Sequence, residues 1–213
     1  MEILNVLSSI FGKVLDLITL NRYADFLITS DLQFGFKAKR STNMCTMVLK
    51  EAIDYYTSNS SSVFCTLLDA TKAFDRVDYC KLFRSLMKGS PSHSVAFVIK
   101  YVYKTGDPSL LERSVFLSFT LSNGVKQGGI LSPILFCTYI DSLLYSLAES
   151  GVGCFIGRLF VGALVYADDI VLLSPTAFGM RTLLHLCDVF ANDFSVVFNA
   201  VTTNLNKVIV VHS

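Results

Sequence analysis

The sequence contains little charge, no tryptophan and no long apolar run without a break. Charged residues make up 16% of its 213 positions and hydrophobic residues 52%, which predicts a large buried interior in a chain of one-domain size. The charge-free stretch at residues 127–140 is too short for a transmembrane helix and contains two glycines and a proline. Glu2 and Lys13 interrupt the apolar N-terminus, which therefore lacks the pattern of a signal peptide. We expect a protein that is neither embedded in a membrane nor secreted.

Cysteines with metal-binding spacing are also missing. The six cysteines are scattered, and no two of them stand in a CxxC pair, so the sequence offers no zinc site. Several lie within apolar runs, which is typical of small buried side chains in a reducing compartment. This predicts an intracellular protein, in the nucleus or the cytoplasm. The net charge of +1 by itself argues against a nucleic-acid-binding protein, because such proteins are usually basic.

Helical and β-type patterns alternate along the chain. Apolar residues between Ile3 and Ile18 recur at helical spacing. Short apolar runs predict a buried strand at Val63–Asp69 and a β-hairpin over residues 161–174. Further helices are expected at residues 43–56, 79–87, 94–103, 133–150 and 177–192, and weaker strands at residues 115–121 and 195–199. Strands that are interleaved with helices and joined by a hairpin indicate an α+β fold rather than a doubly wound parallel sheet.

Two helix starts carry recognisable caps. Ser41 and Thr42 precede the helix expected at residues 43–56, and side-chain hydroxyls at such positions accept hydrogen bonds from the first free N–H groups. Ser132 followed by Pro133 predicts an N-cap with proline at the first helical position. These caps fix the expected starts of both helices.

Asp168 and Asp169 stand side by side between two apolar β-type runs. Adjacent carboxylates in apolar surroundings repel each other and are costly to bury. Divalent cations reduce that cost, and magnesium prefers hard oxygen ligands of this kind. The alternative is an exposed Asp-Asp turn at the tip of a hairpin, and this motif alone leaves both alternatives open.

Asp69 ends a second apolar strand and so projects from the edge of a sheet. Alone, it would more often cap the next helix. Together with Asp168 and Asp169, it provides three carboxylates that could hold two metal ions across a sheet. Such a pair of ions can activate a hydroxyl nucleophile and stabilise a phosphate leaving group.

Five segments together resemble the reverse transcriptases of LINE-type (non-LTR) retrotransposons. In chain order they are DLQFGFKAKRST, LLDATKAFDRV, NGVKQGGILSPILF, YADDIVLLSP and SVVFNA. The resemblance covers residues 8–200, and its order and spacing are far more specific than one Asp-Asp pair. It implies a polymerase fingers–palm fold with an antiparallel palm sheet packed on helices. It assigns partial fingers to residues 1–62 and the palm to residues 63–213, with fingers-type elements interleaved around residues 89–123 and no thumb.

The resemblance also implies the chemistry and its metal ligands. Asp69, Asp168 and Asp169 match the catalytic carboxylates, and the backbone carbonyl of Ala70 matches a further metal ligand. The expected cofactor is a pair of Mg²⁺ ions, with Mn²⁺ as an alternative. The expected partners are an RNA template, a DNA primer and deoxynucleoside triphosphates, with no obligate protein partner.

Binding residues follow from the same motifs. Phe74 matches the steric gate, where a ring excludes a nucleotide 2′-hydroxyl; the alternative is a core phenylalanine. Gln127 and Gly128 match the loop beside the nascent base pair; the alternative is an ordinary glycine turn. In the basic loop, the candidates for contacts with template backbone or triphosphate are Lys37, Lys39 and Arg40; the alternative is a solvated loop.

The ends of the chain depart from the family pattern. Residues 1–7 stand where the family has a segment with an arginine near the triphosphate. After Ala200, the sequence lacks the family's lysine-rich turn. These departures lead to an alternative function, in which a catalytically silent remnant at most binds RNA or an RNA–DNA hybrid.

Overall fold

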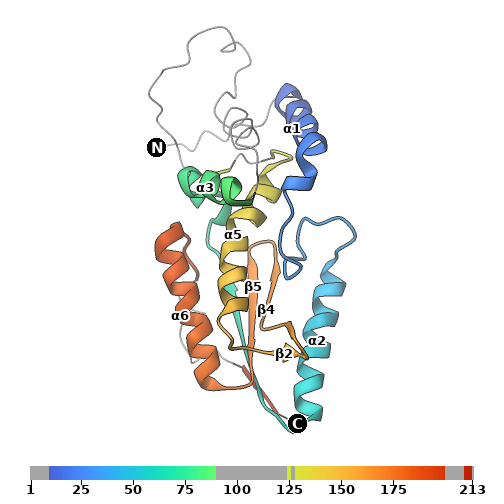
Figure 1. Cartoon of the computed structure of the whole chain (residues 1–213), viewed down its shortest axis with the longest axis vertical. Coiled ribbons are helices and arrows are strands. Elements are labelled where there is room, and N and C mark those ends of the chain that lie inside the picture. Colours follow the sequence, from blue (N-terminus) through green and yellow to red (C-terminus); the bar gives the residue numbers. More distant parts are fainter. Residues whose placement is uncertain (1–9, 90–123, 126–127, 200–208, 213) are drawn as a thin grey trace. The chain divides into compact units, whose positions relative to one another are not determined.

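The computed structural model describes residues 10–89, 124–125, 128–199 and 209–212 (Figure 1). The chain divides into two compact units, one formed by Met1–Ile28 with Phe74–Tyr139 and the other by Thr29–Ala73 with Ile140–Ser213. The helix expected at residues 94–103 and the strand expected at residues 115–121 lie outside the described residues. So do residues 1–9 of the N-terminal pattern.

The second unit is built around a four-stranded sheet. Its strands are β1 (Val63–Asp69), β4 (Ala163–Tyr166), β5 (Asp169–Ser174) and β6 (Ile209–Val211), in the order β4-β5-β1-β6. All neighbouring strands are antiparallel. The α+β class and the predicted antiparallel sheet are confirmed, and β1 has the predicted bounds. The sequence did not predict β6.

A tight hairpin joins β4 to β5. Tyr166 pairs with Asp169 in the register of the two strands, so only Ala167 and Asp168 form the turn. Ala167 has a positive φ of 60°, whereas Asp168 does not. A positive φ at the first turn residue alone is typical of type II′ turns, where glycine is preferred because it has no Cβ. An alanine therefore occupies a position of the turn that usually requires glycine.

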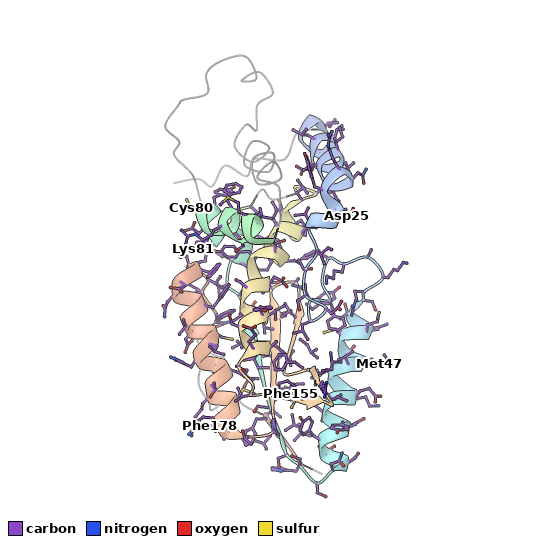
Figure 2. All side chains as sticks on the ribbon, in the orientation of Figure 1. Asp25, Met47, Cys80, Lys81, Phe155 and Phe178 are labelled. Carbon is purple, nitrogen blue, oxygen red and sulfur yellow. The ribbon has the colours of Figure 1, made fainter. Side chains whose placement is uncertain are left out.

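Two helices of this unit lie on either side of the sheet in Figure 1. Helix α2 (Thr42–Ser58) begins after Ser41, whose side chain accepts a hydrogen bond from the Met44 N–H, so the predicted cap is confirmed. Helix α6 (Ala177–Phe194) is capped in the same way by Thr176. Met47 and Phe178, both labelled in Figure 2, are exposed side chains of these two helices.

Apolar side chains from α2 and the sheet form the core on one side. One cluster of buried residues joins α2 to the strands and to the loop before β4: Ala52, Val63, Cys65, Cys154, Val161 and Leu173. A short hairpin of β2 (Phe155–Ile156) and β3 (Leu159–Phe160) adjoins it. The Tyr56 hydroxyl of α2 accepts a hydrogen bond from the Phe155 N–H at 2.7 Å and donates one to the Phe155 carbonyl at 2.9 Å. The segment that contains this hairpin, which follows α5 (Ser132–Glu149), is thereby tied to α2.

The strand expected at residues 195–199 is wrong as a strand. Ser195 caps α6 in a left-handed conformation, and only Phe198 forms a bridge, with Ala70. On either side of this bridge, the Thr71 N–H donates to Val197 and the Asn199 N–H donates to Asp69, both at 2.8 Å. The segment therefore supports the end of β1 over a single antiparallel bridge.

The first unit is helical in its described part. It contains α1 (Ile10–Tyr23), η1 (Ala24–Phe26), most of η2 (Ala73–Arg76), α3 (Tyr79–Gly89) and the first part of α5 (Ser132–Glu149). The α5 helix begins one residue earlier than predicted, because the Leu135 N–H already donates to the Leu131 carbonyl at 2.9 Å. Ser132 is therefore the first helical residue rather than the N-cap. Among the described helices, none has the length and hydropathy needed to cross a lipid bilayer.

Helix α1 buries polar side chains. The predicted helix is confirmed from Ile10 onward. Its predicted apolar face is wrong within this unit, because Ile10, Val14 and Ile18 are exposed while Asp16 and Thr19 are 3% and 2% exposed. The Asp16 carboxylate accepts a hydrogen bond from the Ile130 N–H at 2.9 Å. This bond ties the helix to the loop before α5 and compensates for burying the carboxylate.

Candidate active site

Asp69 and Asp169 face each other across the β1–β5 ladder. They are paired in the strand register, at the last residue of β1 and the first residue of β5. Directly opposite residues of an antiparallel pair project their side chains from the same face of the sheet, about 5 Å apart at Cβ. Asp168 is the adjacent turn residue and is half-buried. The structure therefore brings the three predicted carboxylates to one end of the sheet.

The charges at this end influence one another. The pKa of Asp169 is raised, first by burial and then by repulsion from Asp168 and Asp69. Each of these causes disfavours the charged form of the Asp169 side chain. A cation at this end of the sheet would offset that repulsion, so the site has the electrostatic character of a cation-binding site.

The donor set fits a divalent metal ion by its chemistry. Magnesium takes oxygen ligands and usually binds through one or two carboxylates together with substrate phosphates. Within the described ranges, no group of three or more histidine, cysteine, aspartate or glutamate side chains is gathered tightly enough to hold an ion alone. A site of this kind would therefore depend on oxygen atoms from the substrate as well as on the aspartates.

Backbone contacts hold the end of β1 against the turn. The Ala70 N–H donates to the Asp168 carbonyl at 3.4 Å, and Ala70 also forms the bridge with Phe198. Ala70 itself is buried. The residue predicted to offer a carbonyl ligand is therefore held beside two of the carboxylates by main-chain hydrogen bonds.

The basic loop is largely engaged in contacts of its own unit. The Lys37 ammonium donates to the carbonyls of Thr29 and Ser30 at 2.7 and 2.6 Å. The Ser30 N–H in turn donates to the Asp141 carboxylate of α5 at 2.6 Å. The pKa of Asp141 is raised overall, because the effect of burial exceeds the lowering caused by the Ser30 N–H and by the charge of Lys37. Lys37 thus stabilises the fold of the loop, whatever else it binds.

The other two basic residues differ in their surroundings. The Arg40 guanidinium pairs with the Asp31 carboxylate at 2.7 Å and lies over the Phe34 ring at 5.2 Å from its centre. Lys39 is exposed and has a positive φ of 63°. Of the three candidates for backbone contacts, Lys39 presents its charge most openly to the solvent.

The predicted nucleotide-binding residues belong mainly to the first unit. Phe74 is half-buried, and its ring packs against Phe136 with 4.8 Å between ring centres. Its carbonyl accepts a hydrogen bond from the Val125 N–H at 2.7 Å. Gly128 has a positive φ of 76°, which favours glycine, and an added Cβ would meet open space. Gln127 lies outside the described residues.

Sequence reasoning missed one contribution to the site. Residues 32–35 lie along β4, where Gln33 forms a parallel bridge with Val165. The interpretation of the DLQFGFKAKRST motif relied on its aromatic and basic residues, whereas its Gln33 is completely buried. A polar residue between Leu32 and Phe34 was the available signal, because a buried amide must find hydrogen-bond partners.

Comparison with known proteins extends these observations. The sequence matches the reverse transcriptase (RNA-dependent DNA polymerase) family over residues 4–211. A retrovirus-related Pol polyprotein from the type-2 retrotransposable element R2DM of Drosophila melanogaster is 36% identical over 125 residues, covering 58% of this chain and 12% of that protein. Another, from the type-1 retrotransposable element R2 of Nasonia vitripennis, is 30% identical over 145 residues, covering 68% of this chain and 14% of that protein.

A solved structure shares the fold. The apo telomerase of Candida tropicalis, truncated from its C-terminal domain, superimposes with a TM-score of 0.57 at 12% identity, over 97% of this chain and 41% of that one. The chain spans 12% to 14% of the length of the two retrotransposon polyproteins. Because the family match covers nearly the whole sequence, this chain belongs to the reverse transcriptase family, as its LINE-type motifs predicted.

Proposed function

We propose that this chain is the catalytic part of an RNA-directed DNA polymerase from a non-LTR retrotransposon. The observation that carries the proposal is the cross-strand pair of Asp69 and Asp169 with Asp168 in the adjoining turn, in a chain of the reverse transcriptase family. Reverse transcriptases use divalent metal ions. The ions proposed here are two Mg²⁺, with Mn²⁺ as a substitute, held by the three carboxylates and the carbonyl of Ala70.

The reaction needs precise placement of two oxygen atoms. The primer 3′-oxygen forms a bond to the α-phosphorus of a deoxynucleoside triphosphate, the bond between that phosphorus and the bridging oxygen breaks, and pyrophosphate leaves. Bound metal ions would favour loss of the hydroxyl proton and stabilise the charge on the leaving group. Asp69 and Asp168 fix the binding position at the sheet edge, and Asp169 lies on the side proposed for the primer terminus.

Substrate selection is assigned to residues of both units. Phe74 is proposed to exclude the 2′-hydroxyl of ribonucleotides, and Gln127 and Gly128 to line the nascent base pair. Lys39 is the strongest candidate for a phosphate contact, because its charge is exposed. Lys37 and Arg40 would contribute to the same surface while they stabilise the loop.

We extend the proposal to the polymerase lobes and partners. The sheet of the second unit, which carries all three aspartates, is assigned to the palm, and residues 1–62 to partial fingers. The partners would be an RNA template, a DNA primer and deoxynucleoside triphosphates. The same proposal assigns its action to the nucleus or the cytoplasm.

Primer extension tests the proposal. The wild-type chain and a double variant, Asp168→Asn with Asp169→Asn, are compared on a primed RNA template with magnesium and deoxynucleotides. Both proteins must first show a cooperative unfolding transition. Extension by the wild type alone supports the proposal, whereas equal extension by the double variant would contradict it.

A second candidate function is binding without catalysis. The exposed charge of Lys39 in the basic loop favours it. A binding remnant would hold an RNA–DNA hybrid with an affinity that falls as salt rises, and Asp168→Asn would leave that affinity unchanged. Magnesium-dependent extension that this substitution abolishes would exclude the binding-only function.

A further inference from the structure

The LQFG segment at positions 32–35 forms an added strand-like pairing along β4. The Phe34 N–H donates to the Val165 carbonyl at 2.7 Å, and the Val165 N–H donates to the Leu32 carbonyl at 2.9 Å. These bonds create the parallel bridge of Gln33 with Val165. Since β4 leads directly into the turn at Ala167 and Asp168, the pairing places the segment beside the candidate active site.

Gly35 lies against the backbone of the turn. A Cβ at this position would collide with the Ala167 nitrogen and would lie 2.9 Å from the Ala167 Cα and 3.1 Å from the Tyr166 carbonyl carbon. These neighbours are main-chain atoms, which cannot move aside as a flexible side chain can. Gly35 is not among the residues with positive φ. The requirement for glycine is therefore one of space rather than of backbone conformation.

Gln33 connects the same segment to the turn through its side chain. It is 0% exposed. Its Oε1 accepts a hydrogen bond from the Gly35 N–H at 2.9 Å, and its Nε2 donates to the Ala167 carbonyl at 3.5 Å, a long hydrogen bond. An amide supplies both an acceptor and a donor, which neither a carboxylate nor an aliphatic side chain of similar size provides.

The turn needs such support because Ala167 has a left-handed conformation. Its φ of 60° is unfavourable for a residue with a Cβ, and such conformations persist only where the surroundings enforce them. The Ala70 N–H holds the Asp168 carbonyl from the side of β1. Gln33 and Gly35 hold the preceding residue from the side of β4. The turn that carries Asp168 is thus constrained from two directions.

We infer that Gln33 and Gly35 are positioning residues, which keep Ala167 in its left-handed conformation and thereby fix the Asp168 carboxylate beside Asp69. The inference rests on the proposed function of these carboxylates as metal ligands. Neither residue contacts the reacting groups. They act on the chemistry through the backbone of the turn. Substitutions at either residue should therefore change both the affinity for metal ions and the reaction rate.

The test measures Mn²⁺ binding by the whole chain in the presence of a deoxynucleoside triphosphate and without primer, because the site is expected to need phosphate oxygens as well as the aspartates. The electron paramagnetic resonance signal of free Mn²⁺ is followed and corrected for the Mn²⁺ that the nucleotide binds alone. Asp168→Asn defines the binding that depends on the site. Gly35→Ala and Gln33→Met are each expected to weaken this binding about tenfold, the usual effect of losing an outer support of a metal ligand. In primer extension, kcat should fall more than KM for the nucleotide rises.

Two further variants separate positioning from a general loss of stability. Gly157→Ala places a Cβ at a residue with a φ of 62° and open space around it. Its backbone penalty falls in the turn between β2 and β3 rather than in the β4–β5 turn, so it should leave Mn²⁺ binding unchanged. Ala167→Gly removes the left-handed penalty and should restore part of the affinity lost in Gln33→Met. A residue that only stabilises the fold would not show that recovery.

The outcomes distinguish this inference from the proposed function. Folded Gly35→Ala and Gln33→Met proteins with wild-type Mn²⁺ affinity would overturn it, as would a wild type without Asp168-dependent binding. If Gly35→Ala does not fold, Gln33→Met and its recovery decide. A wild type that binds Mn²⁺ through Asp168 but extends no primer would refute polymerase activity of this chain and leave the inference to be judged by the binding data.

Discussion

The two ends of the β1–β5 ladder differ although the same two strands form both. At one end, Cys65 pairs with Leu173, and both are buried in a cluster with Ala52 of α2. At the other end, Asp69 pairs with Asp169, and both are exposed. The sheet supplies the same geometry along its length, and the helical cover determines which end contributes stability and which end is exposed to solvent. Substitutions at the two ends should therefore have separable effects.

The largest effect is expected from Asp69→Asn at the exposed end. Loss of one carboxylate should lower the rate of primer extension by about a thousandfold or more, as removal of a group essential to the chemistry usually does. The midpoint of urea unfolding should not fall, because the substitution removes a like charge from beside Asp169. Extension assays and urea titrations on one preparation measure both. A large loss of stability would show that the ends are not separable.

Leu173→Ala, at the buried end, should lower stability much more than it lowers the rate of primer extension. Leu173 is 0% exposed, and truncating a buried leucine to alanine costs about 2–5 kcal/mol of the free energy of unfolding. The matched control is Leu67→Ala on the same ladder, where the side chain is 54% exposed and the cost should be about 0.5 kcal/mol or less. Urea unfolding measures both costs. Equal costs for the two variants would contradict the conclusion that helical cover buries Leu173 but not Leu67.

Thr66→Val examines the middle of the ladder. Thr66 pairs with Leu172, and its buried hydroxyl oxygen has no hydrogen-bond partner in the described part of the chain. Replacing it by a methyl group of the same shape should raise the free energy of unfolding by about 1 kcal/mol. Ser174→Ala is the control, because the buried Ser174 hydroxyl donates to the Thr176 carbonyl at 3.0 Å; its loss should destabilise the protein.

The smallest effect is expected from Cys80→Ser, which should change neither extension nor stability. Cys80 is exposed, whereas Cys65 is buried and burial raises the pKa of its thiol. A raised pKa lowers the fraction of reactive thiolate at neutral pH. A disulfide reagent should therefore label Cys80 first in the native wild type, and Cys80→Ser should remove that fast phase. Rapid labelling of Cys65 in the folded variant would show that the buried end is open.

Much of the second unit followed from local sequence. The run at Val63–Asp69 is apolar or β-branched up to its final carboxylate, and the hairpin is two apolar runs around Asp168, so both elements could be identified without knowledge of their partners. The apposition of Asp69 with the hairpin aspartates was likewise predicted from the strand ends. These features are set within a few residues of chain, where periodicity and turn chemistry carry information.

The missed features depend on distant partners. Strand β6 has three residues and exists through its pairing with β1, and the expected strand at residues 195–199 has only the Phe198 bridge. The burial of Asp16 in α1 is explained by the hydrogen bond that its carboxylate accepts from the Ile130 N–H. The burial of Gln33 is explained by the hydrogen bond that its amide donates to the Ala167 carbonyl in the turn. In each case the relevant partner is far along the chain, so no local pattern could indicate it.

The position of β1 in the sheet has a consequence for how the protein is made. Both of its neighbours come later in the chain: Asp169 follows Asp69 by 100 positions, and Val63 pairs with Val211. Pairings of such long range form slowly because the loop must close before any contact compensates for its entropy. During synthesis, β1 therefore leaves the ribosome with both edges unpaired, and a chain stopped before Asp169 would present them to other chains as a template for aggregation.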